Sequence, residues 1–101
     1  MKRVFDITIN VPLGKRNGVL RISENGGIIR GDIETLGTKN AFTGETADGG
    51  KIKFKGQIRT FIRKFDYTAE GEISKNKIDI VFTGDRYTFS ATGEEIGKEN
   101  K

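Results

Sequence analysis

The chain has 101 residues, with 18 lysines and arginines against 14 aspartates and glutamates, and it contains no cysteine, histidine or tryptophan. This length fits one domain of ordinary size. The missing residue types exclude disulfides, thiolate or imidazole metal sites, and catalysis by a thiol or an imidazole.

The apolar composition is dominated by β-branched residues. The sequence has 13 isoleucines, 4 valines and 10 threonines, 27 in all, against 3 leucines and 4 alanines. Side chains branched at Cβ are stiff at χ1 and suit a pleated sheet better than a helix. We therefore expect an all-β domain.

The N-terminal segment lacks the features of a targeting signal. Met1-Lys2-Arg3 leads directly into an alternating segment, and no run of ten consecutive apolar residues occurs anywhere. A membrane helix needs about 20 apolar residues and a secretory signal needs an apolar block. We expect a cytoplasmic protein with no membrane partner. A signal peptide removed before residue 1 would leave no trace.

The first two strands are predicted from alternation. Residues 5–11 alternate strictly between apolar and polar, which is typical of a half-buried strand, and Pro12 ends it. Residues 13–17 form a basic loop. A second strand follows with Leu20 and Ile22 inward.

Three further strands are predicted from turn signals. Asn25-Gly26 is typical of a type I′ hairpin turn, which places Ile22 opposite Ile29 and Leu20 opposite Gly31. Strands at 28–35 and 41–47 are separated by a loop at 36–40. Asp48-Gly49-Gly50 predicts a three-residue turn before the fifth strand, which carries Ile52, Phe54, Gly56 and Ile58 inward.

The fifth and sixth strands carry opposite charges on their outward faces. The sixth strand directs Phe65, Tyr67, Ala69, Gly71 and Ile73 inward. With residues 61–64 in the loop, the expected cross-strand ion pairs are Arg59–Asp66, Lys55–Glu70 and Lys53–Glu72, each worth about 0.2 to 1 kcal/mol.

Two hairpins complete the chain. A turn at Lys75-Asn76 precedes a strand at 78–82, and a turn near Asp85-Arg86 precedes a strand at 87–91. Residues 94–101 form a polar, frayed tail. We therefore expect one β-domain over residues 1–93.

Glycines recur at inward positions of these strands, at Gly31, Gly44, Gly56, Gly71, Gly84 and Gly93. Inward glycines are favoured where a sheet coils sharply. Eight serial strands are best buried by closing the sheet, which removes both edges. We expect an eight-stranded antiparallel up-and-down barrel, and the alternative is a two-sheet β-sandwich.

This pattern of serial hairpins and inward glycines resembles the small barrels of the streptavidin and lipocalin type, the calycin-like architecture. The resemblance covers nearly the whole chain but lies in architecture alone. The lipocalin Gly-x-Trp element and the biotin-stacking tryptophans of the streptavidin group have no counterpart here. No residue inherits a role from it.

The interior is expected to hold either packed aromatic rings or a small ligand. Small inward residues leave room beside five aromatic pocket candidates, Phe54, Tyr67, Phe82, Tyr87 and Phe89. Eight-stranded barrels can be filled or hollow enough for one small ligand. The sequence leaves both open.

Catalytic and cofactor motifs are absent from the sequence. It has no Gly-x-Ser-x-Gly, phosphate-binding loop, calcium loop or metal-spaced histidines. We expect a non-enzymatic binding module with no catalytic residue, metal or cofactor.

Two further contact surfaces are predicted. Phe61 and Ile62 at a loop tip either bind a protein partner, including a second copy of this chain, or fold back to cap the barrel. The alternative function is binding of a polyanion or single-stranded nucleic acid through basic residues, of which the candidates are Lys15, Arg16, Lys51, Lys53, Lys55, Arg63 and Lys64.

Overall fold

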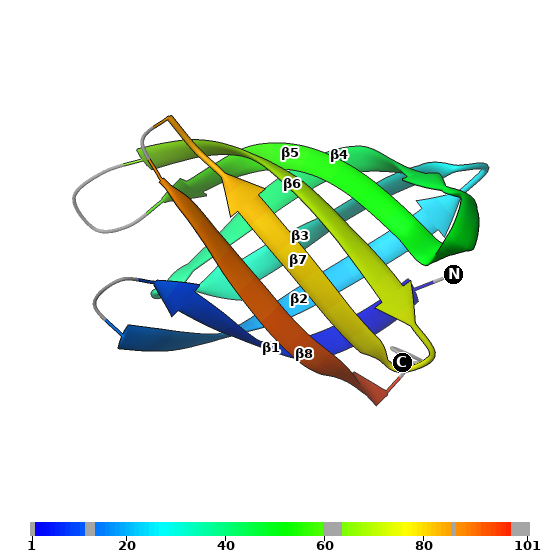
Figure 1. Cartoon of the computed structure of the whole chain (residues 1–101), viewed down its shortest axis with the longest axis horizontal. Coiled ribbons are helices and arrows are strands. Elements are labelled where there is room, and N and C mark those ends of the chain that lie inside the picture. Colours follow the sequence, from blue (N-terminus) through cyan, green and yellow to red (C-terminus); the bar gives the residue numbers. More distant parts are fainter. Residues whose placement is uncertain (1, 12–13, 60–63, 86, 98–101) are drawn as a thin grey trace.

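The computed structural model describes residues 2–11, 14–59, 64–85 and 87–97. Its elements are β1 (Lys2–Val11), β2 (Gly14–Asn25), β3 (Ile28–Thr35), β4 (Thr38–Ala47), the 3-10 turn η1 (Asp48–Gly50), β5 (Lys51–Arg59), β6 (Lys64–Ser74), β7 (Lys77–Thr83) and β8 (Thr88–Gly97). Each strand pairs antiparallel with the next, and β1 pairs with β8 to close the barrel (Figure 1). The predicted up-and-down barrel is confirmed, and the sandwich alternative is wrong.

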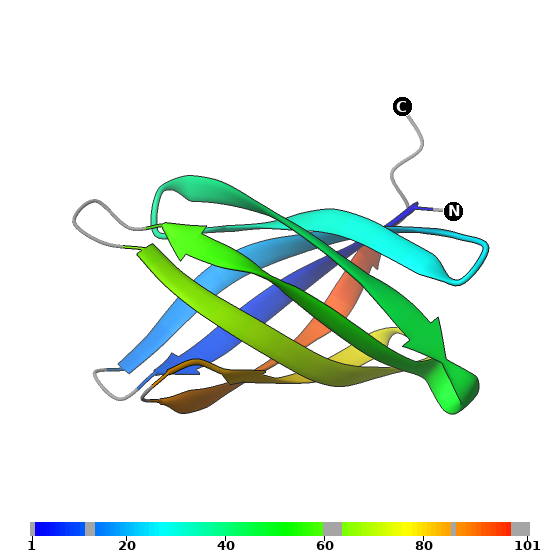
Figure 2. The same cartoon turned by 90° about the horizontal axis from the view of Figure 1, so that it is seen from above.

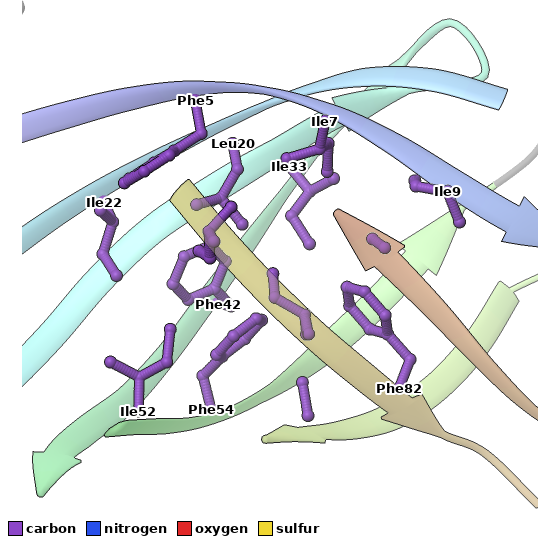
Figure 3. Close-up of a cluster of buried hydrophobic side chains, with 14 of the residues drawn as sticks. Phe5, Ile7, Ile9, Leu20, Ile22, Ile33, Phe42, Ile52, Phe54 and Phe82 are labelled. Carbon is purple, nitrogen blue, oxygen red and sulfur yellow. The ribbon is translucent and has the colours of Figure 1, made fainter. Parts of the chain in front are cut away.

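Alternation along every strand fills the barrel with apolar side chains. Phe5, Leu20 and Phe82 are fully buried, and Figure 3 shows such side chains converging from several strands. Aromatic rings pack together in the middle: the Phe42 and Phe54 centroids lie 4.4 Å apart, and Phe82 stacks on Phe89 at 5.0 Å. The central interior is therefore solid.

Among the described residues, no helical segment has the length and apolar character that crossing a bilayer would need.

The inward glycines lie where neighbouring backbones come closest. A Cβ atom at Gly31 would overlap the carbonyl oxygen of Arg21, and one at Gly44 would overlap that of Lys53. Gly56, Gly71 and Gly93 meet a neighbouring strand's carbonyl oxygen in the same way. Gly84 lies in the connection after β7, against the ring of Tyr87. These contacts explain why a strand interior tolerates glycine here.

The predicted register of β2 and β3 is wrong by two residues. Asn25 pairs with Ile28, so the turn residues are Gly26 and Gly27, with φ of 63° and 86°. Glycine adopts positive φ without steric cost, so two glycines suit this turn better than an asparagine and a glycine. A register shift of two residues leaves the same side chains facing the interior of the barrel.

The predicted register of β5 and β6 is wrong by two residues as well. Lys53 faces Glu70 and Lys51 faces Glu72, whereas Lys55 faces Thr68 and Arg59 faces Lys64. Packing explains the difference, because this register sets Gly56 opposite Tyr67 and Gly71 opposite Ile52. Matching small to large residues inside outweighs exposed ion pairs of about 0.2 to 1 kcal/mol each. Gln57 then donates to Asp66 at 2.8 Å.

Several strand limits also differ from the prediction. β2 begins at Gly14 and pairs with β1, so the expected loop at 13–17 is mostly strand. β4 begins at Thr38 after a tight turn, and β8 continues to Gly97, beyond the predicted limit at residue 93. The three-residue connection at Asp48–Gly50 and the two-residue turn at Lys75-Asn76 are confirmed.

The close approach at Gly44 predicts the effect of adding one methyl group there. Gly44→Ala should lower the free energy of unfolding by about 1 to 3 kcal/mol, because its Cβ must displace the backbone of β5. Urea denaturation followed by circular dichroism measures this. Ala41→Val, which adds carbon to the exposed face of the same strand, should change stability by less than about 0.5 kcal/mol. Equal stability of Gly44→Ala and the wild type would contradict the prediction.

Candidate functional site

The two openings of the barrel are built differently. We call the end where β1 begins and β8 ends the floor, and the end near Val11 and Gly14 the mouth (Figures 1 and 2). At the floor Arg3 donates to both carboxylate oxygens of Glu95, at 2.9 and 3.1 Å, and to the carbonyl oxygen of Lys75 at 2.6 Å. The Arg3 guanidinium carbon lies 5.2 Å from the Phe5 ring centroid. Hydrogen bonding to Glu95 raises the pKa of Arg3, so a partly buried ion pair lies at this end.

The mouth contains an apolar cavity of about 260 Å³. Its accessible wall is made of carbon atoms. The wall comes mainly from the last inward positions of strands at this end, and the described residues that line it are Ile9, Val11, Arg16, Thr35, Leu36, Ile58, Phe65, Tyr67, Tyr87 and Phe89. The cavity therefore lies between the packed centre and the outer rim.

Aromatic rings form one side of this cavity. The Phe65 and Tyr87 centroids lie 5.6 Å apart in an edge-to-face arrangement, and Tyr87 lies 5.8 Å from Phe89. Phe89 also stacks on Phe82 in the core. The cavity wall is thus continuous with the solid interior.

Buried polar side chains tie the strands together beside the cavity. Thr35 donates to the carbonyl oxygen of Asn17 at 2.9 Å, which links β3 to β2. Asn40 donates to the carbonyl oxygen of Ile33 at 3.2 Å, and its Oδ1 accepts from the amide of Arg59 at 2.8 Å. These bonds hold β3, β4 and β5 in place at the mouth.

Tyr67 carries a hydroxyl that is buried with no hydrogen-bond partner among the described residues. The ring extends over Gly56, where a Cβ would lie 3.1 Å from the Tyr67 oxygen. Burial raises the pKa of Tyr67, because the ionised form loses solvation. The hydroxyl stays neutral at ordinary pH.

The five aromatic pocket candidates are divided by the structure. Tyr67, Tyr87 and Phe89 line the cavity, whereas Phe54 and Phe82 belong to the solid core. The sequence analysis did not identify Ile9, Val11, Ile58, Phe65 or Arg16 as pocket residues. The sequence did contain a signal for them, because the alternation of inward and outward positions places each of these residues inward and close to a strand end.

The basic candidates are not brought together on one face. Lys51 faces Glu72, and Lys53 lies between Glu45 and Glu70. Lys55 lies between two threonines, and Lys15, Arg16 and Lys64 lie at the mouth end. Arg63 and the contact candidates Phe61 and Ile62 lie outside the described residues.

A different basic surface lies on the outside of β1 to β4. A shallow groove of about 610 Å³ beside Gly31 is lined by Lys2, Arg3, Ile22, Ser23, Lys39 and others. Its lining contains five cationic residues against one carboxylate, and Arg21 is held by Asp32 at 2.8 Å and Glu34 at 2.9 Å. Within the described residues, no group of carboxylates or other ligands is suited to hold a metal ion.

The unpartnered hydroxyl predicts an unusual effect of Tyr67→Phe. Removing a buried polar group that has no partner should raise the free energy of unfolding by about 1 kcal/mol at neutral pH. Because the folded-state pKa is raised above the ordinary value near 10, wild-type stability should fall as pH rises above that value. The decline should be reduced in Tyr67→Phe and retained in Tyr87→Phe. Chemical denaturation at pH 7 and above pH 10 measures both effects, and a destabilised Tyr67→Phe would show that the hydroxyl has a partner.

Comparison with known proteins adds no relative to this description. No protein-family model matches the chain, and no curated protein or solved structure matches it either. The fold is therefore assigned from its own topology, as an eight-stranded antiparallel up-and-down β-barrel.

Proposed function

We propose that this barrel is a non-enzymatic binding module that holds one small apolar ligand in the cavity at its mouth. The observation that carries the proposal is a carbon-walled cavity at one end of the barrel, the end opposite the Arg3–Glu95 ion pair. Small barrels of the calycin type, which this architecture resembles, include proteins that hold one small ligand in this manner.

The volume limits the size of the ligand. A dry apolar cavity of about 150 Å³ is large enough to take up benzene. A cavity of about 260 Å³ therefore suits a ligand of about ten non-hydrogen atoms, such as a medium-length alkyl chain or a compact ring system.

The chemistry of the wall favours binding over catalysis. An ordered water molecule needs two to four polar partners, and a carbon wall supplies none, so an apolar ligand displaces no strongly held water. Among the described lining residues the buried hydroxyl of Tyr67 stays protonated because its pKa is raised. The wall thus offers mainly carbon surface for a ligand to bury.

The proposal predicts saturable binding of a neutral probe. Titration with n-octanol, followed by amide chemical shifts in NMR, should perturb residues around Ile9, Ile58 and Phe89. Val11→Trp should abolish these shifts, because the indole fills the cavity. Val81→Trp makes the same change on the outer face, where Val81 is 48% exposed, and should bind as the wild type does. Unchanged binding by Val11→Trp, or no saturable binding at all, would refute the proposal.

The outer basic groove supports polyanion binding as a second candidate function. Arg30 and Lys2 line this groove with no ion pair to any described carboxylate. Affinity for a polyanion would depend on neutralising its charges and would fall steeply with salt.

The second function predicts retention on heparin at low ionic strength. Arg30→Gln should elute at lower salt than Lys77→Gln, a matched loss of one charge outside the groove. Equal elution of the two variants would locate the interaction elsewhere, and absence of retention would exclude this function.

A further inference from the structure

Arg16 occupies an unusual position for a charged residue. It pairs with Ile9, a buried inward residue of β1, so the alternation of β2 places Arg16 on the inward side. The other charged residues at inward register positions on the described strands are Arg3, Glu24 and Glu95, and all three lie toward the floor. Within the described strands, Arg16 is therefore the one charged residue at an inward register position at the mouth, and it is exposed there.

Arg16 and Arg3 differ in what they bind. Arg3 makes two hydrogen bonds to Glu95, whereas the Arg16 guanidinium donates to a backbone carbonyl, that of Lys15, at 3.2 Å. Arg16 has no ion pair to any carboxylate in the described part of the chain. Its side chain also lines the cavity, and because the accessible wall is carbon, the aliphatic stem supplies the lining.

The surrounding charges reinforce a positive potential at the mouth. Arg59 lies directly opposite Lys64 across β5 and β6, although like charges in such a pair repel. Lys15 adds a further positive charge beside Arg16 on β2. Among the described carboxylates at this end, Asp85 lies in the connection after β7, Glu34 is paired with Arg21 at 2.9 Å, and Asp66 accepts from Gln57 at 2.8 Å. An anion at the mouth would therefore meet more positive than negative charge.

From this arrangement we infer that the ligand is an apolar carboxylate whose hydrocarbon part occupies the mouth cavity and whose carboxylate binds Arg16. The inference rests on the proposed function and adds the chemical class of the ligand. A guanidinium matches a carboxylate with two parallel hydrogen bonds. The cavity and Arg16 are adjacent, so one small molecule satisfies both.

The inference is tested by comparing octanoate with n-octanol, which share chain length and differ in charge. Wild-type protein should bind octanoate about tenfold more tightly than n-octanol. Arg16→Gln should remove this preference, because it should lower the affinity for octanoate much more than the affinity for n-octanol. Arg16→Lys keeps the charge and loses the planar fork of the guanidinium. Its preference for octanoate should lie between that of the wild type and that of Arg16→Gln. NMR titration measures all six affinities, and circular dichroism verifies that each variant is folded.

Lys15→Gln is the matched control, because it removes one charge from the neighbouring position, whose side chain alternation directs outward. It should keep most of the octanoate preference. If Lys15→Gln and Arg16→Gln lost the octanoate preference equally, direct recognition by Arg16 would be overturned, because general electrostatic attraction at the mouth would explain the result. Equal affinity of the wild type for octanoate and n-octanol would overturn the inference while leaving the cavity function intact. Failure of both ligands to bind would overturn the proposed function itself.

Discussion

Closure of this barrel depends on how closely neighbouring backbones approach at the inward glycines. At Gly31, Gly44 and Gly93 a Cβ atom would occupy space that a carbonyl oxygen of the next strand already fills. A side chain there would push the strands apart and flatten the sheet, whereas a sheet must coil to close on itself. Without closure β1 and β8 would be exposed edges, and neither the floor nor the mouth would exist.

The face on which each side chain lies could be predicted from the sequence, but the register could not. Alternation has a period of two, so Ile22 and Phe54 are inward in any register that slips by two residues. The choice among those registers depends on finer terms. Gly27 takes a positive φ that Asn25 would adopt at a cost, and Gly56 accommodates the ring of Tyr67. Charge pairing on the outer face of β5 and β6 was a weaker guide than packing inside.

The candidate site was predictable only in part, for a related reason. Tyr67, Tyr87 and Phe89 could be identified as inward aromatic residues, yet whether they fill the barrel or line a cavity depends on volumes contributed by all eight strands. Phe54 and Phe82 show the difference, because the same parity places them in a solid centre. Arg16 was identified as a polyanion candidate and not as a cavity residue, since its polar, glycine-flanked segment has the composition of a loop. Pairing with β1 extends that segment as a strand, and the strand then turns Arg16 inward.

An arginine occupies an inward register position at each opening of the barrel, and the two have different partners. Arg3 is paired with Glu95 and lies over the Phe5 ring, so its charge is matched within the chain at the floor. At the mouth the buried polar groups of Thr35 and Asn40 are also matched within the chain, whereas the buried hydroxyl of Tyr67 has no hydrogen-bond partner among the described residues. Against that background Arg16 is a specific feature, because it is an exposed arginine at an inward register position and has no ion pair to a described carboxylate. Since apolar wall and cation lie side by side, the molecule that best complements the mouth is itself amphipathic.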